Sequence, residues 1–441
     1  MTKKNNTISS EEMWLKAQHI IPGGNGFFSK RPEQFLVGGG WPAYYEKSKG
    51  CDIWTKENTQ YLDMALMGVG TCTLGYANDE VDSAVINAIS SGVMSSLNCP
   101  EEYELAEKLV HLNPWSDMVR FTKSGGEANA VAIRIARSAA KSEKIAICGY
   151  HGWHDWYLAS NLENPSSLNE HLMDGLYTSG VPKILAGSTI PFTYNDLEGL
   201  IKLIDEENIG IVKMEVQRNI PPKDNFLQDV RNLCTKHGII LIFDECTSGF
   251  RENLGGLHLT YNVHPDIAMY GKAMANGHAI CAVVGKEEIM KHANKSFISS
   301  TFWSERSGYV AALKTLEVME RIKSYDIITS IGKKVKESWL TLANTHNLNI
   351  KIRGLDALAG FSFESDLDNH YKSFITESML SYNILATNTI YTCIAHTDDK
   401  LEKYFEGLDK CFHEISKRFP DEPLYDQMKY KDSNVGFKRL N

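Results

Sequence analysis

The stretch GIILIFDE, residues 238–245, decides the fold class of this 441-residue chain. Its five apolar residues, Ile239 to Phe243, stand between a glycine and two carboxylates. A short unbroken apolar run rich in Ile is typical of a strand that is buried on both faces, as at the centre of a parallel sheet. The preceding residues 229–237 have a helical pattern, so helix and strand together fit a βαβ connection.

Four further runs in the middle of the chain have the same character: KIAICG (144–149), IGIVKMEV (209–216), PDIAMYGK (265–272) and AICAVVG (279–285). Helical patterns separate them. This alternation predicts an α/β domain that is built on one mostly parallel sheet.

The two ends of the chain have a different sequence pattern from that of the middle. A capping box, Ser9 with Glu12, predicts a short helix, and residues 35–64 look like short strands and turns. Near the other end we expect a long helix over 313–339, strands within 351–364 and an amphipathic helix over 401–415. We therefore predict a small-domain segment at 1–65, a large domain at 66–320 and a smaller α+β domain at 321–441.

Composition excludes several classes of protein. Lys and Arg number 46 against 55 Asp and Glu, a net charge of -9, which argues against a generally basic nucleic-acid binder. No run approaches the ~18 apolar residues of a membrane helix, and the first residues lack the apolar core of a signal peptide. The nine cysteines are scattered without a CxxC pair and read as free thiols. We expect a cytoplasmic enzyme without a membrane or nucleic-acid partner.

Ligands of open parallel sheets bind beyond the carboxyl ends of the strands, so the residues there are informative. Ser124, Gly125 and Gly126 precede a strong helical pattern and form either a phosphate seat or a plain capped turn. Tyr150 follows another strand and could lie on the face of a flat ring. The neighbouring His151 and His154 form an HxxH pattern, which is weak evidence for zinc because no further ligand has useful spacing.

Asp244 ends the most apolar strand, where a carboxylate needs a cation or hydrogen-bond donors. It either caps the next turn or pairs with a cationic nitrogen of a ligand. Lys272 ends another strand among small residues; it either reaches solvent or acts as a nucleophile toward an aldehyde. A phosphate seat, an aromatic ring, an acid and an amine in this order match one cofactor, pyridoxal 5'-phosphate (PLP).

The motifs SGGEANAVAIRIAR (124–137), GYHGWHD (149–155) and LIFDECTSGFR (241–251) make the chain resemble the class III aminotransferases of fold type I. Within them it is most similar to the glutamate-1-semialdehyde aminomutase branch. The resemblance implies that Lys272 forms the imine with the cofactor and that Asp244 faces the pyridine nitrogen.

The same resemblance implies the rest of the cofactor site. Ser124, Gly125 and Gly126 would bind the phosphate, and Tyr150 would stack on the ring beside His151. Glu215 would lie close to the cofactor and substrate. Thr301 would reach the phosphate from the neighbouring subunit, which would make the enzyme a homodimer.

The chain departs from the family pattern in four places. Gly126 replaces a Thr or Ser, Val216 replaces a Pro, and Glu305-Arg306 replaces an Asn-Pro pair. The aminomutase stretch with a carboxylate-binding Arg is replaced by residues 26–32, where Lys30 or Arg31 could substitute. We interpret this as a retained catalyst with a changed substrate. An aminotransferase is favoured; the alternatives are an intramolecular aminomutase and a non-catalytic binder.

Overall fold

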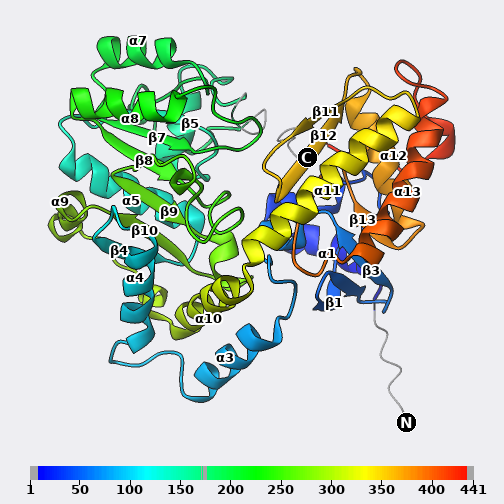
Figure 1. Cartoon of the computed structure of the whole chain (residues 1–441), viewed down its shortest axis with the longest axis horizontal. Coiled ribbons are helices and arrows are strands. Elements are labelled where there is room, and N and C mark those ends of the chain that lie inside the picture. Colours follow the sequence, from blue (N-terminus) through cyan, green and yellow to red (C-terminus); the bar gives the residue numbers. More distant parts are fainter. Residues whose placement is uncertain (1–7, 170, 172–175, 435–441) are drawn as a thin grey trace. The chain divides into compact units, whose positions relative to one another are not determined.

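The computed structural model describes residues 8–169, 171 and 176–434 (Figure 1). These residues form two compact units. Among the described residues, one unit contains those up to Val69, Gly75–Ala77 and those from Ser330 onward. The other contains Gly70–Leu74 and Asn78–Thr329. We call the first the terminal unit and the second the central unit.

A seven-stranded sheet organises the central unit, in the order β4-β10-β9-β8-β7-β5-β6. The strands from β9 to β6 are parallel, whereas β10 is antiparallel to both β9 and β4. The five predicted strands are confirmed as β5, β7, β8, β9 and β10. The strand bounds are β4 (Met118–Thr122), β5 (Ile145–Cys148), β6 (Thr189–Pro191), β7 (Ile211–Glu215), β8 (Ile240–Asp244), β9 (Ile267–Tyr270) and β10 (Cys281–Gly285).

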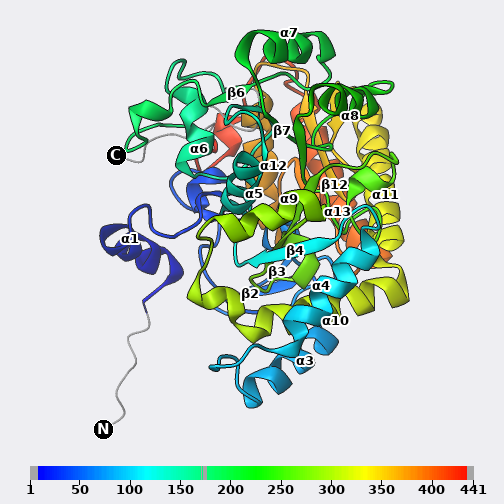
Figure 2. The same ribbon diagram turned by 90° about the vertical axis from the view of Figure 1, so that its left-hand side faces the viewer.

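Helices cover both faces of this sheet, with α5 and α8 on opposite sides (Figure 2). The α5 face packs Ile135 and Ala136 against Ile145, Ile242 and other strand residues in one buried cluster. The helices are α3 (Asp79–Ser90), α4 (Pro100–Leu112), α5 (Gly125–Ala139), α6 (Asp155–Leu158), α7 (Leu197–Glu207), α8 (Phe226–His237), α9 (Glu287–Met290) and α10 (Arg306–Ile322). None of the described helices has both the length and the apolar content to cross a bilayer.

The single long helix expected over 313–339 is wrong, because two helices occupy that region. Helix α10 ends at Ile322 and α11 (Ser324–Thr345) begins two residues later. Lys323 between them has a φ of 51°, and its N–H donates to the Met319 carbonyl. This left-handed residue ends the first helix. Glycine or asparagine usually marks such a position, so the lysine gave no signal in the sequence.

The terminal unit joins both ends of the chain. Strand β13 (Ile384–Ala386) pairs in parallel with β3 (Gln60–Met64) in the sheet β1-β2-β3-β13. The expected strands of residues 351–364 form a hairpin, β11 (Ile350–Arg353) and β12 (Leu358–Phe363), in the sheet β11-β12-β14. The remaining elements are α1 (Ser10–Ile20), β1 (Tyr45–Lys49), β2 (Asp52–Thr55), α12 (Asp368–Leu380), β14 (Thr389–Tyr391) and α13 (Asp398–Ser416). Helices α1 and α13 and strands β1 to β3 confirm the predictions for those segments.

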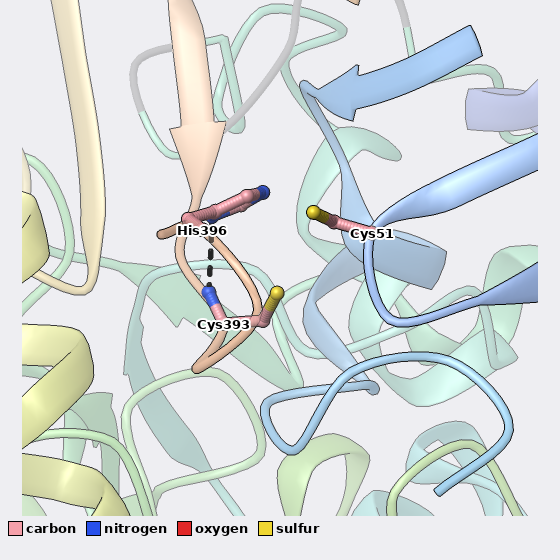
Figure 3. A group of neighbouring side chains, drawn as sticks. All are labelled: Cys51, Cys393 and His396. Atoms are coloured by element: carbon pink, nitrogen blue, oxygen red, sulfur yellow. Dashed lines mark hydrogen bonds between the residues drawn. The ribbon is translucent and has the colours of Figure 1, made fainter. Parts of the chain in front are cut away.

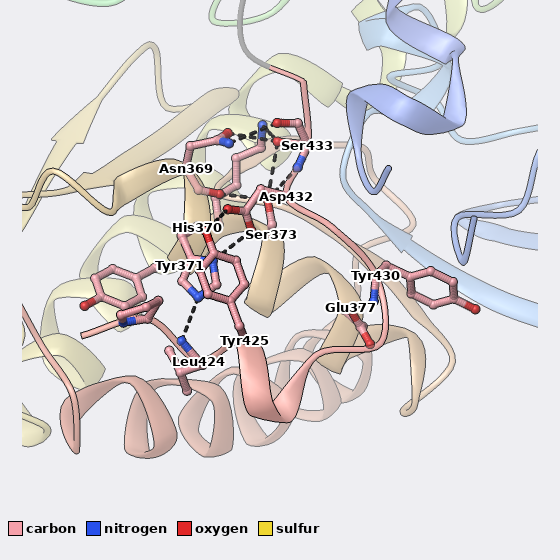
Figure 4. A network of polar contacts seen from close by, with 12 residues as sticks. Asn369, His370, Tyr371, Ser373, Glu377, Leu424, Tyr425, Tyr430, Asp432 and Ser433 are labelled. Carbon is pink, nitrogen blue, oxygen red and sulfur yellow. Dashed lines mark hydrogen bonds and ion pairs between the residues drawn. The ribbon is translucent and has the colours of Figure 1, made fainter. Parts of the chain in front are cut away.

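The segment after α13 is tied to α12 by a polar network (Figure 4). The ring of His370 lies between Asp432, 2.8 Å from its Nδ1, and the backbone N–H of Leu424, which donates to its Nε2. Ser433 N–H donates to the Ser373 hydroxyl at 2.9 Å. The helix thus supplies the partners that an irregular segment needs for its backbone groups.

A second histidine, His396, is buried beside Cys51 and Cys393 (Figure 3). Its Nδ1 accepts a hydrogen bond from the Cys393 N–H at 3.2 Å, and its Nε2 lies 2.8 Å from the Asp63 carbonyl oxygen. A neutral imidazole with its proton on Nε2 satisfies both contacts. Burial therefore lowers the pKa of His396 to about 4. In the part of the chain that the structure describes, no disulfide bond joins the cysteines.

We predict that His396 makes stability fall as the pH drops from 6.5 toward 4. The unfolded chain takes up the proton near pH 6.5 and the folded one only near pH 4, so the loss reaches about 3 kcal/mol at full protonation of both states. Urea unfolding followed by circular dichroism at several pH values measures this dependence. The His396→Gln variant should show a shallower dependence; equal slopes in the two proteins would contradict the prediction.

Candidate active site

Residues near the carboxyl ends of β7, β8 and β9 lie side by side in the central sheet. Glu215 at the end of β7 pairs with Asp244 at the end of β8, and Asp244 pairs with Met269 in β9. Lys272 follows three residues after Met269. The parallel order of the strands therefore brings Glu215, Asp244 and the Lys272 segment to the same edge of the sheet, as expected for an α/β ligand site.

Asp244 is buried and surrounded by donors. Its Oδ2 lies 2.9 Å from His151 Nδ1 and 3.7 Å from Lys213 Nζ. Its Oδ1 accepts a hydrogen bond from the Cys246 N–H at 3.1 Å. Burial alone would raise the pKa of this carboxyl, but Lys213 and His151 outweigh burial and hold the pKa well below its usual range. Asp244 is therefore a carboxylate at neutral pH.

Lys213 lies inside the apolar run of β7, and the sequence pattern did not predict a role for it. Its side chain is fully buried, and its Nζ lies 3.0 Å from the Met269 sulfur. Burial lowers the pKa of Lys213, while Asp244 acts in the opposite direction. A charged residue in the middle of a strand buried on both faces is a signal in itself, because such a residue needs a buried counterion.

Lys272 begins the turn that follows β9. Its Nζ donates a hydrogen bond to the Thr247 hydroxyl at 2.8 Å. Its backbone has a φ of 44°, a left-handed conformation that costs a non-glycine residue about 1 kcal/mol or more. Strain of this kind clusters at functional sites, where the surrounding structure holds one side chain in a defined place.

The predicted phosphate seat is the first turn of α5. Ser124 caps the helix in a capping box with Glu127, so its hydroxyl accepts from the Glu127 N–H. The N–H groups of Gly125 and Gly126 are in the first turn, where an α-helix supplies no partner of its own. Cys246 links this turn to the sheet edge, because its sulfur lies 3.7 Å from where a Cβ on Gly125 would be.

Tyr150, in the loop after β5, lies beside Glu215, the last residue of the neighbouring strand β7. The Tyr150 N–H donates to Glu215 Oε2 at 3.1 Å, and Glu215 Oε1 lies 2.8 Å from Arg218 Nη1. Both residues of this ion pair line a cavity of about 230 Å³, together with His171 and Tyr194. Asp244 and Lys272 do not line this cavity. The cavity adjoins the candidate site through Glu215, and the ion pair gives it a charged wall.

The charges introduced by Glu305-Arg306 are paired. Lys123 Nζ lies 2.8 Å from Glu305 Oε2 and also donates to the Glu305 carbonyl. Arg306 makes two hydrogen bonds to the Glu101 carboxylate, at 3.0 and 2.6 Å. Lys123 is thus engaged with Glu305.

Thr301 is exposed at the start of the 3-10 helix Thr301–Ser304, and its role toward a neighbouring subunit stays a prediction. Of the HxxH pair, His151 binds Asp244, and His154 stacks on Trp153 with ring centroids 4.4 Å apart. In the part of the chain that the structure describes, the one group with metal-ligand spacing is the buried cluster of Cys51, Cys393 and His396 in the terminal unit.

Comparison with known proteins identifies the family. The model of the family "Aminotransferase class-III" matches residues 38–412. The chain belongs to the class III aminotransferases. It is 33% identical to 3-aminobutyryl-CoA aminotransferase of Cloacimonas acidaminovorans, over 95% of this chain and 100% of that protein. It is 31% identical to glutamate-1-semialdehyde 2,1-aminomutase of Sulfurisphaera tokodaii, over 92% of this chain and 100% of that protein.

Solved structures confirm the fold expected for this class III aminotransferase. The FumI protein of Sphingopyxis sp. MTA144, in its PLP internal aldimine form, superposes with a TM-score of 0.84. The identity is 21%, over 95% of this chain and 99% of that chain. An omega-transaminase from Sphaerobacter thermophilus gives a TM-score of 0.82 at 21% identity, over 94% of this chain and 99% of that one. The fold is that of the fold type I PLP-dependent transferases.

The class III aminotransferases use PLP, and the residues present fit this cofactor. The charged Asp244 suits a protonated ring nitrogen, and Lys272 offers an amine at the same sheet edge. The first turn of α5 is open toward a phosphate at Gly125 and Gly126. In addition, His154 Nδ1 near Gly126 is a buried nitrogen without a hydrogen-bond partner among the described residues. A buried polar atom without a hydrogen-bond partner indicates that a ligand binds there.

We predict that Lys213→Met destabilises the protein more without PLP than with it. The substitution removes the buried cation beside Asp244 and leaves the carboxylate to His151 and the Cys246 N–H. We expect a loss of about 1–3 kcal/mol in the apo protein and a smaller loss when a protonated ring nitrogen faces Asp244.

Urea unfolding with and without PLP measures both values. Lys202→Met is the matched control, because Lys202 is an exposed lysine paired with Glu206 at 3.9 Å and should change stability by less than about 0.5 kcal/mol. Equal losses for Lys213→Met in the two states would contradict the link between this lysine and the cofactor.

Proposed function

We propose that this aminotransferase uses Lys272 and Asp244 as its catalytic pair and transfers an amino group between two separate small-molecule substrates. The observation that carries the proposal is the buried carboxylate of Asp244, kept ionised by Lys213 and His151 on a sheet edge that also holds Lys272. Ser124, Gly125 and Gly126 would bind the phosphate of PLP. Tyr150 would face the ring, with Glu215 beside it.

Each of these residues has a defined task. When bound, PLP supplies the electron sink that stabilises negative charge on the substrate carbon. Lys272 Nζ takes the proton from that carbon and returns it to a different atom, as a general base and then a general acid. Its hydrogen bond to Thr247 orients the amine. The carboxylate of Asp244 keeps a proton on the ring nitrogen opposite to it.

The substrate side of the site differs from that of the family pattern. Glu215 and Arg218 form an ion pair on the wall of the cavity, and Val216 replaces the usual proline. The replacement of the proline by Val216 supports a changed substrate, and we therefore favour an aminotransferase with a separate donor and acceptor. The 31% identity to an aminomutase favours a second candidate, in which the nitrogen returns to the same skeleton.

We predict that the purified protein is yellow and that borohydride fixes the cofactor on Lys272. Mass spectrometry of the peptide that contains Lys272 would locate the label. Lys272→Ala should bind PLP without forming the reducible bond and should lose at least about 10³-fold in kcat. A Lys272→Ala protein with normal turnover would contradict the proposal.

The same preparation separates the two candidate functions. An aminotransferase given an amino donor alone releases one carbonyl product per site and stops with an aminated cofactor. An aminomutase retains the skeleton and forms its isomer. A panel of carbonyl compounds added to the aminated form then identifies the acceptor by the return of the yellow colour.

We also propose a homodimer in which Thr301 completes the site of the neighbouring subunit. The exposure of Thr301 supports this arrangement, because its side chain is available to another chain. The nine free thiols support a reducing compartment, and we infer the cytoplasm. The predicted limits of 1–65, 66–320 and 321–441 remain our proposal for the domains.

We predict that mixed dimers of Lys272→Ala and Thr301→Ala subunits regain activity. If Thr301 acts on the neighbouring subunit, one of the two sites in the mixed dimer has both Lys272 and Thr301 intact. Differently tagged subunits, purified as the mixed dimer, should show about half of the wild-type kcat at low PLP concentration. Activity no higher than that of the Thr301→Ala homodimer would place Thr301 in its own subunit's site or outside it.

A further inference from the structure

The first turn of α5 has a feature that the sequence motif does not explain. In the family pattern the residue at position 126 carries a hydroxyl, and here it is glycine. A Cβ added to Gly126 would lie 2.8 Å from Cε1 and 3.0 Å from Nδ1 of the His154 ring. Contacts under 3.0 Å are closer than real side chains allow. The imidazole of His154 therefore occupies the space of a side chain at position 126.

The ring of His154 is held in this place. It stacks on Trp153 with a centroid separation of 4.4 Å and an interplanar angle of 22°. Trp153 Nε1 itself lies 3.5 Å from the Cβ position of Gly126. A ring fixed by stacking loses little further freedom when it binds a ligand, so its nitrogen is preorganised at the start of α5.

The nitrogen that faces Gly126 has no hydrogen-bond partner. His154 Nδ1 is buried, and no described residue forms a hydrogen bond with it. A buried polar atom is rarely left without a hydrogen-bond partner, so one at a ligand site indicates the ligand's own polar atom. The start of α5, a helix of 15 residues, is also where N–H groups and the helix dipole favour an anion.

We propose that His154 donates a hydrogen bond from Nδ1 to the phosphate of PLP and so replaces the hydroxyl that Gly126 lacks. The inference rests on the proposed function, because it requires PLP in this site. Burial lowers the pKa of His154, although Glu127 and Asp155 oppose this effect. The ring is therefore neutral at pH 7 and carries one proton, which Nδ1 can donate.

A comparison of two cofactors tests this role. Pyridoxal lacks the phosphate but has the same ring and aldehyde as PLP. His154→Ala should weaken the binding of PLP to the apo protein by about tenfold to a hundredfold, as for one hydrogen bond to a charged group, and change pyridoxal binding by less than about threefold. Absorbance titration of the apo protein gives both dissociation constants. The control His111→Ala removes an exposed histidine in the last turn of α4 and should leave both constants unchanged.

Variants that restore the family arrangement make the test sharper. Gly126→Thr alone should weaken PLP binding, because its Cβ collides with the His154 ring. Gly126→Thr combined with His154→Ala should bind PLP within about threefold of wild type, because the threonine hydroxyl takes over the hydrogen bond. Gly126→Ala with His154→Ala fills the same space without a donor and should stay as weak as His154→Ala.

The outcomes separate this inference from the proposed function. An equal loss of PLP and pyridoxal binding in His154→Ala would overturn the inference, since His154 would then only fill space. Unchanged PLP binding in that variant, or recovery by the alanine pair, would overturn it as well. A wild-type protein that binds neither cofactor would instead remove the proposed function, on which the inference depends.

Discussion

The structure of the site depends on one buried charge, the carboxylate of Asp244. A carboxylate at the centre of a sheet is costly unless cations and donors surround it. Three segments provide them: the loop after β5 supplies His151, strand β7 supplies Lys213, and the turn after β8 supplies the Cys246 N–H. Each of these segments is therefore fixed relative to the others by the same charge.

The same residues connect the two ends of the proposed cofactor site. Cys246 donates to Asp244, and its sulfur lies between the first turn of α5 and the strand end at Gly271. Thr247, the next residue, accepts from Lys272. One short turn after β8 thus contacts the acid, the amine and the phosphate seat. The order of the strands, with β8 between β7 and β9, makes this arrangement possible.

Much of this arrangement of strands and strand-end residues could be predicted from the sequence, because local sequence patterns indicate it. The apolar runs around Ile145 and Ile240 identify central strands, and the residues after them lie at the carboxyl ends in any parallel sheet. Lys213 was not predicted as a site residue, because a run with a single lysine still has an apolar pattern. The end of α10 was not predicted either, because lysine rarely adopts the left-handed conformation that Lys323 has. The contact between residues 126 and 154 is non-local, and no local pattern could indicate it.

The departures from the family pattern show how such non-local contacts keep the site intact. Glu305 and Arg306 would add charge near the site, but Lys123 and Glu101 neutralise them within hydrogen-bond distance. Because each added charge has a partner of opposite sign, these substitutions leave no unpaired charge at Glu305 or Arg306. The surroundings of Asp244 can stay unchanged in this way, since Asp244 is held by His151 and Lys213 and the added charges are held by Lys123 and Glu101.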